Sequence, residues 1–165
     1  MSSEYPYILL EESCNTVSSD RCHCLDLENN ILRKSCVGCG RCFIEYPYEE
    51  AFKHIYDFSK SSCSKTFIVV LPRSSEGILV PVNTSLRVIE IQGVYIRTLV
   101  SEGEEISAGS KIAQILTGKG EFRTFRSSGE GVVVYISDLL EEDFNKIVIL
   151  VADKLSLQRV EIRDE

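Results

Sequence analysis

The chain has 165 residues, of which 44% are hydrophobic and 26% charged, and its mean hydropathy is close to zero. This is the composition of a globular protein with enough residues to bury a core, and no apolar run is long enough to cross a bilayer. Without such a run we expect no membrane partner. The net charge of -7, with acidic residues in excess in both halves, argues against a broadly basic surface, so we expect no nucleic-acid partner.

The N-terminus, MSSEYPYILLEES, lacks the basic start and apolar stretch of a secretory signal, which predicts a cytoplasmic protein. All seven cysteines lie in the first 63 residues. Clustered cysteines in a cytosolic protein indicate metal or redox chemistry more often than disulfides, with hyperthermophile cytosols as an exception. The cysteines are Cys14, Cys22, Cys24, Cys36, Cys39, Cys42 and Cys63.

Residues 1–75 read as a small α+β region that contains these cysteines. Tyr7–Glu11 predicts a strand, and the sequence Glu28–Asn29–Asn30 between two apolar pairs predicts a hairpin turn. Pro47 suits the first turn of a helix, and apolar residues recur after it at helical spacing. We therefore expect one helix from about Tyr48 to Ser59.

The end of this region predicts a strand and then a boundary. Lys65–Leu71, with the sequence KTFIVVL, predicts a buried strand that Pro72 ends. The polar run Arg73–Gly77 is the stretch that best fits a linker. A second domain would then begin near residue 78.

Residues 78–155 predict an all-β domain, because short β-rich runs alternate with turn residues throughout. Asp138–Phe144 is the one stretch that could form a helical turn, and residues 156–165 predict a final strand or tail. The spacing favours a sandwich or a small barrel, and the whole chain is predicted to be mainly β. The runs are ILVPV, RVIEI, VYIRTLV, KIAQIL, EFRTF, GVVVYI and KIVILVA.

Glycines in this domain recur in a pattern that suggests two related halves. GVYIRTLV begins at Gly93 and GVVVYIS begins at Gly131, about half a domain later. Gly103–Glu104–Glu105–Ile106 and then Gly109 form a glycine–acidic turn followed by a second glycine. With the strands between them, these positions resemble the biotinyl/lipoyl (barrel-sandwich hybrid) family, which implies that fold for residues 78–155. The chain is also similar to a small archaeal family of unknown function with a C-terminal domain of this kind.

Lys119 occupies the position that carries biotin or lipoate in the family that this domain resembles. The lysine lies in TGKGEF, where the family has an exposed hairpin tip. Biotin carriers generally flank this lysine with Met, and lipoyl carriers usually precede it with Asp, whereas here both neighbours are glycines. These neighbours favour a solvated lysine over one modified with biotin or lipoate.

The sequence CVGCGRCFIEYP over residues 36–47 resembles part of a bacterial-type ferredoxin motif, C-x2-C-x2-C-x3-C-P. Cys36, Cys39 and Cys42 fill the first three ligand positions, and Tyr46 replaces the fourth cysteine. The resemblance implies a [4Fe–4S] cluster that takes its fourth thiolate from elsewhere. The candidates for that thiolate are Cys14, Cys22, Cys24 and Cys63.

Zinc is the alternative metal, because Cys22 and Cys24 together with Cys36 and Cys39 could supply four thiolates. Free buried thiols or disulfides, with no metal, are the third reading. A small cysteine-rich module buries little core, so we expect a bound metal or disulfides to stabilise it.

No enzyme motif accompanies these cysteines. The two histidines, His23 and His54, have no obvious acidic partner, and the chain has no phosphate loop, nucleotide fingerprint or hydrolase motif. We therefore expect a non-catalytic binding or accessory protein with a cysteine-ligated metal and a protein partner. The alternatives are an iron–sulfur electron-transfer protein and a carrier modified on Lys119.

Overall fold

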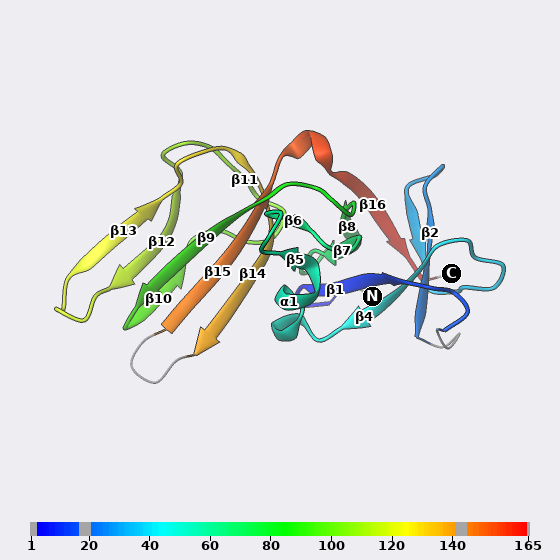
Figure 1. Cartoon of the computed structure of the whole chain (residues 1–165), viewed down its shortest axis with the longest axis horizontal. Helices are drawn as coiled ribbons and strands as arrows, with labels where there is room; N and C mark the ends of the chain where they lie inside the picture. Colours follow the sequence, from blue (N-terminus) through cyan, green and yellow to red (C-terminus); the bar gives the residue numbers. More distant parts are fainter. Residues whose placement is uncertain (1–2, 17–20, 141–144, 165) are drawn as a thin grey trace. The chain divides into compact units, whose positions relative to one another are not determined.

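The computed structural model of the chain describes residues 3–16, 21–140 and 145–164 (Figure 1). The chain divides into two compact units: unit 1 comprises Met1–Thr84 and Leu155–Glu165, and unit 2 comprises Ser85–Lys154. Both units are built mainly from β-strands, which confirms the predicted mainly-β class. Among the described residues, no helix is both long and apolar enough to span a bilayer.

Seven strands of unit 1 close into a barrel in the order β1-β4-β2-β3-β16-β8-β7. The pairs are antiparallel except for β16 and β3, which run parallel. Closure gives every strand a hydrogen-bonded neighbour on both sides, so no described strand of the barrel is an edge strand. The strands are β1 (Tyr7–Glu12), β2 (Cys22–Asp26), β3 (Ile31–Arg33), β4 (Cys42–Tyr46), β7 (Phe67–Val70), β8 (Glu76–Val80) and β16 (Gln158–Arg163).

Apolar side chains from all seven strands fill the barrel, and none of the eight at its centre is more than 6% exposed. Such burial is the main favourable contribution to the stability of the unit. The central residues are Leu9, Leu25, Leu32, Phe43, Ile68, Val70, Leu79 and Val160.

The turn predicted at Asn29–Asn30 is confirmed, and it joins β2 to β3. Asn30 has a φ of 55°, a left-handed conformation that asparagine tolerates better than most residues. The Asp26 carboxylate accepts hydrogen bonds from the backbone N–H groups of Glu28 and Asn29, at 3.1 and 3.3 Å. This turn sets the register in which Cys24 faces Arg33 across the hairpin.

The helix predicted over residues 48–59 is wrong in its extent. The structure has a 3-10 turn at η1 (Tyr48–Glu50) and a single α-helical turn at α1 (Phe52–Ile55). The chain then becomes extended at β5 (Tyr56–Asp57), which pairs with β6 (Ser62–Cys63). Tertiary pairing of Tyr56 with Cys63 thus overrides the helical spacing of the apolar residues.

The polar stretch Arg73–Gly77 is part of a β-hairpin and not a linker. It connects β7 to β8, and Gly77 pairs with both Val70 and Val160 within the barrel. Arg73 adopts a φ of 55°, as a tight reversal requires. The change from unit 1 to unit 2 comes later, after Thr84.

Unit 2 consists of a three-stranded sheet, β10-β12-β13, and a four-stranded sheet, β11-β14-β15-β9. Figure 1 shows the long strands β9, β15 and β14 side by side, in agreement with their antiparallel registers. Residues Asp138–Leu140, where a helical turn was expected, belong to β14, and residues 141–144 lie outside the described residues. The strands are β9 (Leu86–Gly93), β10 (Tyr95–Thr98), β11 (Glu105–Ile106), β12 (Lys111–Leu116), β13 (Phe122–Arg126), β14 (Gly131–Leu140) and β15 (Asn145–Ala152).

The core of unit 2 draws side chains from both sheets, so the two sheets pack face to face. Ile112 and Ala113 of β12 are fully buried, as are Val133 of β14 and Ile149 of β15. The 3-10 turn η2 (Lys154–Ser156) begins at the last residue of unit 2 and leads to β16 in the barrel of unit 1. Unit 2 is therefore inserted into the sequence of unit 1.

Candidate cysteine site in unit 1

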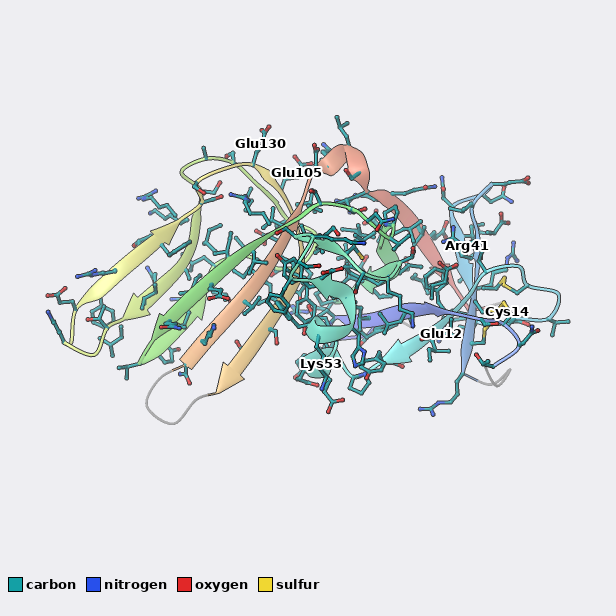
Figure 2. All side chains as sticks on the ribbon, viewed as in Figure 1. Glu12, Cys14, Arg41, Lys53, Glu105 and Glu130 are labelled. Carbon is teal, nitrogen blue, oxygen red and sulfur yellow. A yellow bond between two sulfur atoms is a disulfide. The ribbon has the colours of Figure 1, made fainter. Side chains whose placement is uncertain are left out.

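Six cysteines converge at one end of the unit 1 barrel. Cys22 and Cys24 lie on β2, and Cys42 begins β4, where it is the direct cross-strand partner of Cys24. Cys14 follows β1, and Figure 2 labels it near Glu12 and Arg41, with yellow sulfur atoms beside it. The remaining two, Cys36 and Cys39, lie in the loop between β3 and β4.

The sulfurs of these six cysteines are at bonding distance in three pairs, Cys14–Cys42, Cys22–Cys36 and Cys24–Cys39. The corresponding Cα–Cα distances are 5.3, 5.8 and 5.8 Å, within the usual range for disulfides. The disulfide alternative thus describes the pairing of the cysteines in this structure.

The sulfurs also gather in threes. Cys14, Cys39 and Cys42 form one triad, and Cys22, Cys36 and Cys42 form another. Within each triad, all sulfurs lie within 4.8 Å of one another, so a metal ion could bind there. The structure therefore brings together all five cysteines predicted from the sequence and adds Cys14. Cys24 belongs to neither triad, but its sulfur is paired with that of Cys39.

A tight turn gives the C-x2-C segment its convergent geometry. The backbone N–H of Cys39 donates to the carbonyl of Cys36 at 3.1 Å. Gly38, between them, has a φ of 70°, a left-handed conformation that is strained for residues with a side chain. The turn thereby directs both thiols of the motif toward β2.

Two ion pairs border the cysteine cluster on the side of β1. The Arg41 guanidinium donates two hydrogen bonds to the Glu11 carboxylate, at 2.7 and 2.9 Å, and this pairing raises the pKa of Arg41. Lys65 pairs with Glu12 beside them. These four side chains, together with Cys14 and Cys39, line an open depression at this end of the barrel.

Neither histidine belongs to a sulfur triad among the described residues. His23 lies between Cys22 and Cys24 on β2, so its side chain points to the opposite face of the strand from theirs. Burial, with a contribution from the charge of Lys34, lowers the pKa of His23 below the usual value. His54 is exposed, and its Nε2 lies 2.7 Å from the Tyr46 hydroxyl. A local hydrogen bond thus accounts for His54, whereas the buried Nδ1 of His23 has no hydrogen-bond partner among the described residues.

Cys63 lies apart from the other six cysteines. It is fully buried on β6, its thiol donates to the backbone carbonyl of Lys65 at 2.6 Å, and burial raises its pKa to about 11. A thiol of this kind is a poor ligand and a poor nucleophile at neutral pH. Cys63 therefore does not supply the additional thiolate.

Lys119 lies in unit 2, at the exposed tip of the hairpin between β12 and β13. The Thr117 backbone N–H donates to the carbonyl of Glu121 at 2.8 Å, and that of Gly120 donates to Thr117 at 3.0 Å. Gly120 has a φ of 81°, so the glycine after Lys119 meets a conformational requirement of the turn.

Fold and site together define a mainly β protein with a cysteine cluster that could hold metal. A family model described as an uncharacterized protein conserved in archaea (DUF2118) matches residues 15–154. The chain belongs to this family, which confirms the predicted similarity to an archaeal family of unknown function. Searching the curated proteins yields no match. The matched range covers all of unit 2 and begins just after Cys14.

Proposed function

We propose that this chain is a non-catalytic binding or accessory protein that holds a metal through its N-terminal cysteines. The observation that carries the proposal is the grouping of sulfurs in threes. A disulfide uses two sulfurs and needs no third sulfur beside it. Each triad nevertheless places a third cysteine sulfur within 4.8 Å of a bonded pair.

This spacing suits thiolate coordination. Sulfurs that bind tetrahedral zinc at about 2.3 Å from the ion lie about 3.8 Å apart. Iron in an iron–sulfur cluster also takes cysteine thiolates as ligands. Both metals require reduced cysteines, so the disulfide-paired arrangement corresponds to the oxidised, metal-free chain.

Metal analysis of native protein, purified anaerobically with a reductant, tests this proposal. We expect at least one metal ion per chain, retained by a Cys63→Ala control because Cys63 lies outside the cluster. A colourless zinc protein would exclude electron transfer, and a brown protein with acid-labile sulfide would establish a [4Fe–4S] cluster. A reduced chain that contains no metal and takes up neither zinc nor iron would contradict the proposal.

We also propose that unit 2 is a biotinyl/lipoyl-like domain of the barrel-sandwich type. Its two face-to-face sheets and its glycine turns support this proposal. Gly103 and Gly109 have φ values of 90° and 89°, and each lies where the family pattern has a turn glycine. The resemblance concerns the fold and does not require modification of a lysine.

A protein partner is part of the proposed accessory role, and the three-stranded sheet of unit 2 supports it. Tyr95 faces Leu116 across β10 and β12, and Leu116 faces Phe122 across β12 and β13. The three residues thus form one row on the same face of the sheet. Tyr95 and Phe122 are 59% and 81% exposed, which is more typical of an interaction surface than of solvated strands.

A carrier function at Lys119 is the second candidate, and the exposed hairpin tip favours it. We nevertheless expect an unmodified lysine, because its glycine neighbours do not match those of biotin or lipoyl carriers. Intact-mass measurement of protein from cells that modify other carriers checks this expectation. An added biotinyl or lipoyl mass that is absent from a Lys119→Arg variant would instead establish the carrier function.

A further inference from the structure

One sulfur is common to both triads of the cysteine site. Cys42 groups with Cys14 and Cys39 on one side and with Cys22 and Cys36 on the other. Its side chain is only 1% exposed, and its position at the start of β4 is fixed by pairing with β1 and β2. A thiolate with neighbours on two sides, on a backbone held by two strands, is suited to bind two ions.

The other cysteines divide between these two sides. Cys24 belongs to neither triad, but its sulfur is bonded to that of Cys39, a member of the triad of Cys14, Cys39 and Cys42. That side offers three grouped sulfurs and, once the Cys24–Cys39 bond is reduced, the thiol of Cys24 as a fourth. The opposite side offers three, from Cys22, Cys36 and the shared Cys42.

We infer that the reduced cysteine site binds two divalent zinc-type ions and that the Cys42 thiolate bridges them. This inference rests on the proposed metal-binding function and adds to it the number of ions and the shared ligand. One ion takes the four thiolates of Cys14, Cys24, Cys39 and Cys42. The other takes Cys22, Cys36 and Cys42, and a water completes its coordination, as in zinc sites with three protein ligands.

Metal binding by the disulfide-bonded chain requires reduction first, and a dithiol reductant from solution supplies the electrons. A dithiol reductant gives each disulfide two electrons and two protons, and the reductant itself becomes a disulfide. The cysteine thiols then lose their protons to solvent as the ions bind, so loading is favoured as the pH rises. Soft thiolates in a tetrahedral arrangement select zinc over harder ions such as magnesium.

Titration of the reduced, metal-free chain with Co²⁺ and Zn²⁺ tests the inference, with Co²⁺–thiolate absorption as the readout. We expect two ions per chain for the wild type and for Cys63→Ala. Cys14→Ser and Cys22→Ser each remove a ligand from one side only, so each variant should keep one tightly bound ion. Cys42→Ser removes a ligand from both sides and should bind neither ion tightly.

A ¹¹³Cd spectrum of the loaded wild type provides a test that does not depend on the folding of a variant. A bridging thiolate predicts two resonances that are coupled to each other through the shared sulfur. A single ion per chain, or two resonances without coupling, would overturn the binuclear site and leave the proposed metal-binding function intact. Failure to bind Co²⁺, Zn²⁺ and Cd²⁺ would overturn the binuclear site, and failure to take up iron as well would overturn the proposed metal-binding function.

Discussion

Reduction of the three disulfides in a metal-free buffer is expected to lower the free energy of unfolding of unit 1 by several kcal/mol. Two of the bonds close loops with sequence separations of 14 and 15 residues, and the third closes one of 28. A loop of about 15 residues contributes roughly 3 kcal/mol by restricting the unfolded chain. Because the largest loop encloses the other two, the total is smaller than the sum of three independent bonds.

This loss is comparable to the whole stability of a small domain, roughly 5–15 kcal/mol. The cysteine end of the barrel is where we expect the structure to open, because β3 has only three residues and the loop after it carries no strand. Adding Zn²⁺ to the reduced chain should restore the lost stability by coupling metal binding to folding.

Hydrogen exchange followed residue by residue measures this effect and separates the two units. Amides of β2, β3 and β4 should lose protection after reduction with a chelator present and regain it with Zn²⁺. Amides of β14 and β15 serve as the internal control, since unit 2 contains no cysteine. Unchanged protection in β2–β4 after reduction would show that the barrel core alone holds the unit together.

Gly131→Ala is expected to destabilise unit 2 by about 3 kcal/mol or more. Gly131 has a φ of 150°, a conformation that residues with a side chain rarely adopt. A Cβ at this position would lie 2.5 Å from Cγ1 of Val151 and 2.8 Å from the carbonyl oxygen of Ala152. The second contact is with backbone in the β14–β15 ladder, so relief requires a shift of the paired strand.

Chemical denaturation of the disulfide-intact protein, followed by exchange at β14 and β15, provides the measurement. Gly118→Ala is the matched control: the same substitution in the same unit, at a position where an added Cβ meets nothing within 4 Å. The control should change the stability by less than about 0.5 kcal/mol. Equal stabilities for the two variants would show that the β14–β15 ladder adjusts freely around residue 131.

Local patterns in the sequence were sufficient to predict most of the strands. The runs GVVVYI and KIVILVA form β14 and β15. Both are rich in β-branched residues and lie between turn residues, a pattern that favours buried strands. The hairpin at Asn30 was also predictable, since its chemistry lies within five residues. These features depend on neighbours along the chain.

Features that depend on distant pairing could not be predicted in this way. A polar run such as Arg73–Gly77 looks the same in a linker and in a hairpin. The pairing of Gly77 with Val70 and Val160 in the barrel distinguishes them, and Val160 lies more than 80 residues later. The helix at 48–59 was overestimated for a different reason: the local β5–β6 pairing that ends it has no counterpart in helical periodicity.

The cysteine site shows the same division between local and long-range information. Spacing within the C-x2-C-x2-C segment predicted Cys36, Cys39 and Cys42 as ligands. Cys14 was only a candidate for the additional thiolate, because it belongs to no spacing motif. It reaches the cluster because Glu12, two residues before it, pairs with Cys42 across β1 and β4.

The insertion of unit 2 into unit 1 has a consequence for how the protein is made on the ribosome. Unit 2 contains all of its own strands in one continuous stretch, so it can fold as soon as it emerges. The barrel must wait for β16, which follows unit 2 in the chain and fills the place between β3 and β8. Until then, these two strands present unpaired edges, and the nascent chain is most open to aggregation or to chaperone binding in this interval.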